Sequence, residues 1–154
     1  MTDALSPSLQ LRHVSTLRGY PWEIHIVRFS PDGMVLVSVA DSGIAQPVRL
    51  WNMRGRQLIS SLEGHQGQVD DVVFSPDNTI LAITGDDGII RLWTREGKLF
   101  GTLGGGGHAT TALVFSTDSQ FLFTGDEAGR IQVWSLKAKK ILFSFSASSG
   151  GGEI

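Results

Sequence analysis

Residues 74–93 read FSPDNTILAITGDDGIIRLW, and the same pattern occurs twice more in the chain. Residues 29–51 read FSPDGMVLVSVADSGIAQPVRLW, and residues 115–134 read FSTDSQFLFTGDEAGRIQVW. Every copy ends on a tryptophan that follows an aliphatic residue, and these tryptophans stand 42 and 41 residues apart. The first copy is longer because three extra residues lie within residues 42–47. Self-similarity at a fixed period of this length predicts a repeat protein.

Each copy divides into four short runs separated by turn residues. In the second copy the runs are residues 69–74, 79–84, 89–93 and 98–103. Runs of this length, rich in β-branched and aromatic residues and broken by Gly, Asp and Asn, are typical of antiparallel hairpins. Apolar residues nowhere keep a 3.6-residue period over ten positions, so no helix is expected. We therefore predict an all-β fold made of four-stranded antiparallel meanders.

Composition limits the classes of function. The chain has 154 residues, 41% of them hydrophobic, which is enough for one domain with a sizeable core. A formal net charge of -2 provides no positive field for nucleic acid, so we expect no nucleic-acid partner. The absence of cysteine excludes disulfides and thiolate chemistry. With no basic and apolar leader and no run of about 20 apolar residues, we expect a cytoplasmic protein without membrane contact.

The repeat unit resembles the WD repeat, a family in which each copy forms one blade of a β-propeller. The resemblance covers roughly residues 17–145 and rests on the tryptophans and on a Gly-His pair before the first run. The pair is kept in two copies and becomes Gly-Tyr in the first: Gly64-His65, Gly107-His108 and Gly19-Tyr20. The Asp that follows the tryptophan in the family is replaced here by Asn52, Thr94 and Ser135.

The resemblance also implies a buried hydrogen-bonded network of His, Ser or Thr, Asp and Trp in each blade, and this chain keeps only parts of it. Ile83 stands at the Ser position of the second copy, and Ala128 stands at the Asp position of the third. An incomplete network should weaken a blade, because an unsatisfied buried polar group costs about 1–3 kcal/mol. The residues that remain, for which we expect structural roles, are His65, Asp87, Trp93, His108, Thr124, Trp134, Ser38 and Trp51.

By this alignment the chain divides into five segments. They are an N-terminal segment with a strand from a preceding blade (1–16), a first repeat (17–62), a second repeat (63–103), a third repeat (104–145) and a flexible tail (146–154). Three blades are fewer than the four to eight that usually close a propeller, so the outer faces are left open. Two explanations remain: the chain is part of a longer propeller, or several copies associate to close a ring.

Residues that could suggest chemistry have simpler roles in the repeat. Two histidines and two carboxylates could suggest a metal site: His65, His108, Asp87 and Asp126. The two histidines lie in different blades, each at the repeat's own network position, and lack zinc-type spacing. The acidic pairs at residues 70–71 and 86–87 fit strand and turn positions better than acid–base catalysis. Glycines 104–107 lack the Gly-Lys-Ser/Thr ending of a phosphate loop and are interpreted as a flexible connection. We expect no catalytic residue, no metal and no cofactor.

In this fold, function lies on loops, and the resemblance implies a contact face formed by the blade connections and the turns between second and third strands. The residues carried over to it are Trp22, Glu23, His25, Gln66, Gln68, Asp86, Thr110 and Asp126. Trp22 could anchor a partner or pack into its own blade. We predict a non-catalytic scaffold for protein or peptide partners. The alternatives are the propeller part of a larger regulatory or signalling enzyme, and a blade unit that assembles into a homo-oligomer.

Overall fold

A computed structural model describes residues 15–42, 47–104 and 107–146. Several expectations fall wholly or mostly outside these ranges. They concern the strand of a preceding blade within residues 1–16, the insertion within residues 42–47, the centre of the glycine connection at 104–107 and the tail at 146–154. These four stay predictions.

Within the described ranges the chain forms twelve strands and no helix. It follows that none of these residues belongs to a helix long and apolar enough to cross a membrane. The strands are β1 (Ile24–Phe29), β2 (Val35–Ala40), β3 (Val48–Asn52), β4 (Gln57–Leu62), β5 (Val69–Phe74), β6 (Ile80–Gly85), β7 (Ile89–Thr94), β8 (Leu99–Gly104), β9 (Thr110–Phe115), β10 (Phe121–Asp126), β11 (Arg130–Ser135) and β12 (Lys140–Ser146).

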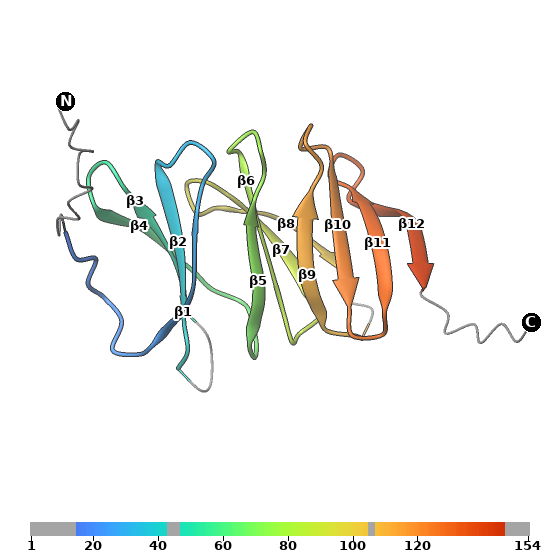
Figure 1. Cartoon of the computed structure of the whole chain (residues 1–154), viewed down its shortest axis with the longest axis horizontal. Helices are drawn as coiled ribbons and strands as arrows, with labels where there is room; N and C mark the ends of the chain where they lie inside the picture. The colour runs from blue at the N-terminus through green and yellow to red at the C-terminus, as the bar shows by residue number, and fades with distance from the viewer. Residues whose placement is uncertain (1–14, 43–46, 105–106, 147–154) are drawn as a thin grey trace, which may run out of the picture.

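The strands form three separate sheets, each an antiparallel meander of four consecutive strands. We call them blade 1 (β1–β4), blade 2 (β5–β8) and blade 3 (β9–β12). Figure 1 shows them side by side in chain order, with the first strands β1, β5 and β9 running in the same direction. The predicted all-β class and the four-stranded antiparallel blades are therefore confirmed.

The Phe-Ser-Pro-Asp motif forms the hairpin turn between the first two strands of a blade. In blade 2 the Ser75 hydroxyl donates to the Asp77 carboxylate at 2.6 Å and accepts from the backbone N–H of Ile80 at 2.9 Å. Asn78 takes the left-handed conformation that this turn requires, with φ at 64°. The same serine-to-aspartate bond closes the turn in blades 1 and 3, so the motif acts as local turn chemistry.

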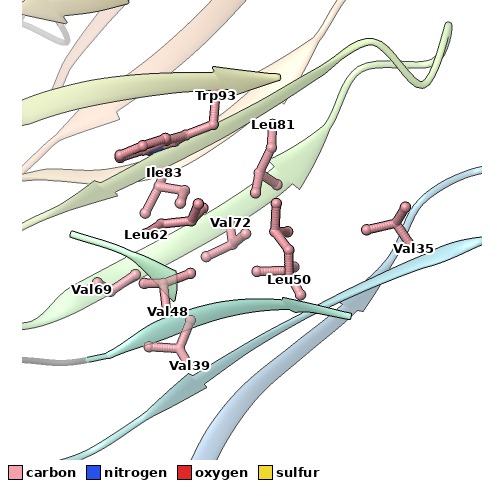
Figure 2. Close-up of a cluster of buried hydrophobic side chains, with 11 residues drawn as sticks. Val35, Val39, Val48, Leu50, Leu62, Val69, Val72, Leu81, Ile83 and Trp93 are labelled. Carbon is pink, nitrogen blue, oxygen red and sulfur yellow. The ribbon is translucent and has the colours of Figure 1, made fainter. Parts of the chain in front are cut away.

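The blades pack face to face, and this packing forms the hydrophobic core. Alternate residues of a strand point to opposite faces of the sheet. Each blade therefore has an upstream face toward the preceding blade and a downstream face toward the next. In Figure 2, Leu50 of blade 1 and Leu81 of blade 2 point toward each other across the first seam. This core consists of Val35, Val37, Val39, Val48, Leu50 and Leu62 from blade 1 and Val69, Val72, Leu81, Ile83 and Trp93 from blade 2.

The second seam repeats the first one blade later. Blade 2 contributes Ala82, Ile90, Leu92 and Leu103 from its downstream face, and blade 3 contributes its upstream face. That upstream face consists of Leu113, Phe115, Leu122, Trp134 and Leu136. Full burial of one aliphatic side chain stabilises a fold by about 1.5–3 kcal/mol, so the seams dominate the stability.

Polar contacts also recur at the seams. The backbone N–H of Asp32 donates to the Asn78 side chain of the next blade at 2.9 Å, and that of Asp77 donates to Ser119 at 3.1 Å. Both acceptor residues, Asn78 and Ser119, occupy the position of the neighbouring blade's hairpin turn at which φ is positive. These bonds set the register of one blade against the next, because each joins equivalent positions of two successive copies.

The two tryptophans Trp93 and Trp22 should contribute very differently to stability. Trp93 lies in the first seam with 7% of its surface exposed, whereas Trp22 is 47% exposed. We expect Trp93→Ala to lower the free energy of unfolding by about 3–5 kcal/mol. Trp22→Ala should stay within about 1 kcal/mol of the wild type. Thermal unfolding followed by circular dichroism measures both, and equal shifts would contradict this packing.

Candidate functional site

One edge of the blades brings together the segments predicted to bind partners. We call it the entry rim: it holds the beginnings of β1, β5 and β9 and the turns that follow β2, β6 and β10, and it is the lower edge in Figure 1. One backbone hydrogen bond recurs on it in all three blades. The N–H donors of Asp41, Asp86 and Glu127 reach the carbonyl oxygens of Glu23, Gln68 and Ala109 at 2.9, 3.0 and 3.1 Å. This bond ties each turn to the segment entering the first strand.

Six of the eight predicted partner-binding residues are exposed, and all six belong to blades 1 and 2. Some also hold the rim in shape: the Asp86 carboxylate accepts from the Gln68 N–H at 3.0 Å. The His25 ring nitrogen Nε2 lies 3.4 Å from the Val69 carbonyl oxygen in the next blade. The exposed residues are Trp22, Glu23, His25, Gln66, Gln68 and Asp86.

The two predicted residues of blade 3 are placed differently. Thr110 is only 7% exposed because it opens β9 against blade 2, where its carbonyl accepts from the Thr84 hydroxyl at 2.9 Å. The Asp126 side chain is 8% exposed and pairs with Arg130 at 2.8 Å. It also accepts backbone bonds from Ala128 and Arg130 at 3.0 and 2.9 Å. These two side chains are therefore less exposed than those of the other six residues, and their role in partner binding stays a prediction.

Two acidic residues that the sequence reasoning missed complete the rim between blades 2 and 3. Partial burial, together with the carboxylates of Asp86 and Glu127, raises the pKa of Asp70 above its ordinary value. Glu127 is exposed and follows Asp86 by 41 residues, the repeat period itself. The period could have identified Glu127, whereas the closeness of Asp70 to both carboxylates depends on packing between blades.

Trp22 borders an apolar cleft on the entry rim between blades 1 and 2. The cleft has a volume of about 370 Å³, and its walls include Pro47, Leu62 and His65 besides the tryptophan. Trp22 thus combines an exposed ring with a hollow beside it. This is the arrangement that an aromatic anchor site offers to an apolar side chain of a partner.

The buried tryptophan networks differ from blade to blade. In blade 1, Trp51 Nε1 donates to the Ser38 hydroxyl at 2.7 Å. Tyr20, which replaces the histidine of the Gly-His pair, lies 3.2 Å from the same hydroxyl and donates to the Ser38 carbonyl at 3.0 Å. Burial raises the pKa of Tyr20, although Ser38 and Arg49 oppose this shift. Tyr20 therefore takes the place of the histidine in this network. From the sequence alone, the change from Gly-His to Gly-Tyr had indicated only that the histidine was lost.

In blade 3, Trp134 Nε1 donates to the Thr124 hydroxyl at 3.2 Å. His108 was expected in this network, but it is exposed. Ala128 provides no carboxylate to hold the histidine ring, and Asp126 is occupied by Arg130. The physical reason for the difference is thus the missing acidic partner of the imidazole.

In blade 2, His65 belongs to a buried cluster that includes a residue the sequence reasoning did not single out. Arg91 lies 2.6 Å from the Asp87 carboxylate and 3.0 Å from His65 Nδ1. Burial and the Arg91 charge lower the pKa of His65 to about 4, so the ring is neutral at pH 7. Burial would raise the pKa of Asp87, but hydrogen bonds from Ile89 and Arg91 outweigh it and lower that pKa.

This cluster leaves two buried nitrogen atoms unsatisfied. Nδ1 of His65 has two neighbours, the Arg91 guanidinium at 3.0 Å and Asp87 Oδ1 at 3.5 Å. Neither His65 Nε2 nor Trp93 Nε1 has a hydrogen-bond partner among the described residues. Ile83, which lies against the Trp93 ring in Figure 2, occupies the position where the other blades have Ser38 and Thr124. The missing hydroxyl therefore explains both unsatisfied atoms.

The comparison with protein families agrees with this geometry. The model of the WD domain, G-beta repeat, matches residues 56–94 and 97–135, which together cover half of the chain. The chain belongs to the WD40 repeat family. Each WD40 match runs from the last strand of one blade through the third strand of the next, so the family unit itself crosses a seam. Among proteins of curated function, no similar sequence was found.

Membership in the WD40 family makes this chain a propeller-type domain for protein interaction. Over the described residues, no three His, Asp or Glu side chains are grouped in a way that could hold a metal ion. The four residues that could have suggested a metal site have other surroundings: His65 and Asp87 contact Arg91, Asp126 contacts Arg130, and His108 is exposed.

Restoring the missing hydroxyl should stabilise blade 2. A threonine hydroxyl at position 83 can hydrogen-bond with both His65 Nε2 and Trp93 Nε1, and each unsatisfied buried polar group costs about 1–3 kcal/mol. Valine is the matched control because it has the same shape without the hydroxyl. We expect Ile83→Thr to exceed Ile83→Val in free energy of unfolding by about 1–3 kcal/mol, measured by urea denaturation. A threonine variant less stable than the valine variant would contradict this account.

Stability should depend on pH through His65. Its pKa is about 4 in the fold against an ordinary 6.5, so between these values the unfolded chain binds the proton more readily. The free energy of unfolding should therefore fall as the pH drops from about 6.5 to about 4, and this contribution should be constant outside that window. The Asp87 contribution appears at lower pH, because the pKa of Asp87 lies below 3.8.

Urea denaturation across this window, on the wild type and two histidine variants, measures the effect. His65→Gln removes the titrating ring and should flatten the slope. His25→Gln replaces an exposed histidine and should keep it. A slope that survives His65→Gln unchanged would show that other groups cause it.

Proposed function

We propose that the chain is a non-catalytic scaffold that binds a segment of another protein along its entry rim. The recurring bond between each turn and the entering segment supports rigid display of these loops. A rigid surface binds at lower entropic cost than a mobile one, because fewer side chains and loops must be ordered. A cytoplasmic location remains part of this proposal.

The observation that carries the proposal is the order of surfaces along the rim. An apolar cleft beside Trp22 lies between blades 1 and 2. Exposed amides follow at Gln66 and Gln68, and the carboxylates of Asp86 and Glu127 lie farther along, near blade 3. A complementary segment would place an apolar side chain in the cleft and basic side chains opposite the carboxylates.

Selection from a random peptide library displayed on phage tests the proposal. We expect the wild-type chain to enrich peptides that contain an apolar residue followed by Lys or Arg. Trp22→Ala and Glu127→Lys should each weaken the binding of the selected peptides at least about tenfold, or about 1.4 kcal/mol. Isothermal titration calorimetry provides the affinities.

The matched control for the charge reversal is Glu96→Lys. Glu96 is also exposed but lies in the turn between β7 and β8, at the opposite rim. It should leave peptide affinity unchanged. Peptides that bind the Trp22→Ala and Glu127→Lys variants as tightly as the wild type would refute binding on the entry rim.

A further inference from the structure

Over the described residues, the upstream face of blade 1 and the downstream face of blade 3 carry apolar side chains that are exposed, although their counterparts in the inner seams are buried. Val27 on the upstream face of blade 1 is 52% exposed, whereas its counterparts Val72 and Leu113 are 0% and 7% exposed. On the downstream face of blade 3, Ile131 is 53% exposed and its counterpart Ile90 is 1% exposed. Each outer face thus repeats one half of a seam that the chain forms twice within itself.

The downstream face of blade 3 is bulkier than the faces it repeats. Phe143 pairs with Val133 at a position where blade 2 has Gly101. Phe145 pairs with Ile131 where blade 2 has Leu103, and Phe123 stands where blade 2 has Ala82. All three phenylalanines are exposed, by 60%, 57% and 37%. This face therefore carries three aromatic rings at positions where the downstream face of blade 2 has smaller residues.

The upstream face of blade 1 contains a cleft, in contrast to the bulky downstream face of blade 3. A cleft of about 460 Å³ opens on it, with walls that include Ile24, Val27, Leu36 and Trp51. In the inner seams the neighbouring blade packs against the equivalent side chains, although a cleft of about 460 Å³ also lies at the second seam beside Ile90, Leu103 and Trp134. The chain therefore has a bulky apolar face at one end and a face with a cleft at the other.

We propose that the downstream face of blade 3 binds the upstream face of blade 1 in a second copy of this chain. Such a contact joins two different surfaces, so it either continues into a filament or closes into a ring. Known propellers have about four to eight blades, and the three described blades of each of two copies would together give six. The product is a six-bladed ring of two copies with two identical seams. Trp22 borders both this cleft and the cleft on the entry rim, so the test of this inference leaves Trp22 unchanged.

Two charged substitutions test the two faces of the proposed seam one at a time. Val27→Asp places a charge on the upstream face of blade 1 alone, and Phe145→Asp places one on the downstream face of blade 3 alone. The matched control is Leu58→Asp. Leu58 is 47% exposed, but its counterparts Leu99 and Ile141 are also exposed, by 54% and 41%, so a covering blade does not bury this position.

Size-exclusion chromatography with light scattering on the full chain measures the result. We expect the wild type and Leu58→Asp to have twice the 16.6 kDa mass of one chain over a tenfold dilution. Val27→Asp and Phe145→Asp should each be monomeric. An equimolar mixture of these two variants should regain a dimer, because each retains the face that the other has lost, and this recovery also shows that both are folded.

Three results would overturn the proposal. A wild type that is monomeric or polydisperse would mean that further blades of a longer polypeptide, rather than a second copy, cover these faces. A dimer that survives both single substitutions, or one that Leu58→Asp disrupts equally, would place the contact elsewhere. A mixture that stays monomeric while each variant retains the circular dichroism spectrum of the wild type would exclude pairing of unlike faces.

Discussion

Burial of apolar surface between neighbouring sheets is the interaction on which the rest of this structure depends. A single four-stranded meander has two faces and no layer of its own to cover either. Val72 and Leu92 point to opposite faces of blade 2, and both are fully buried only because blades 1 and 3 flank it. The turns, the tryptophan networks and the entry rim all take their positions from these two seams.

The tryptophan networks show how much variation such seams tolerate. Blade 1 uses a tyrosine in place of the histidine, and blade 3 keeps only the bond from tryptophan to threonine. Blade 2 keeps the histidine and its acidic partner but lacks the hydroxyl between His65 and Trp93. These local losses of about 1–3 kcal/mol are small beside the many apolar side chains buried at each seam. Packing therefore preserves the blade while its polar network changes.

The entry rim combines a rigid framework with a changing surface. Equivalent backbone bonds hold its loops in all three blades. The exposed side chains differ along the rim, from the aromatic ring of Trp22 at one end to the carboxylates of Asp86 and Glu127 at the other. Repetition thus determines the framework, and the differences between repeats determine what it can bind. The same division applies to the outer faces, where Phe143 and Phe145 depart from the smaller residues of the inner blades.

The sequence by itself determined the period, the four strands of each blade and their turns, because alternating apolar residues and turn chemistry act over a few neighbouring positions. It also placed the motif that contains Ser75 and Asp77 between two strands, and the structure showed the bond by which these residues close the turn. Only the tertiary structure decided which polar side chains remain available. Thr110 became buried against blade 2 and Tyr20 joined the network of Ser38, because both outcomes depend on contacts with residues far along the chain. Such contacts leave no local pattern in the sequence.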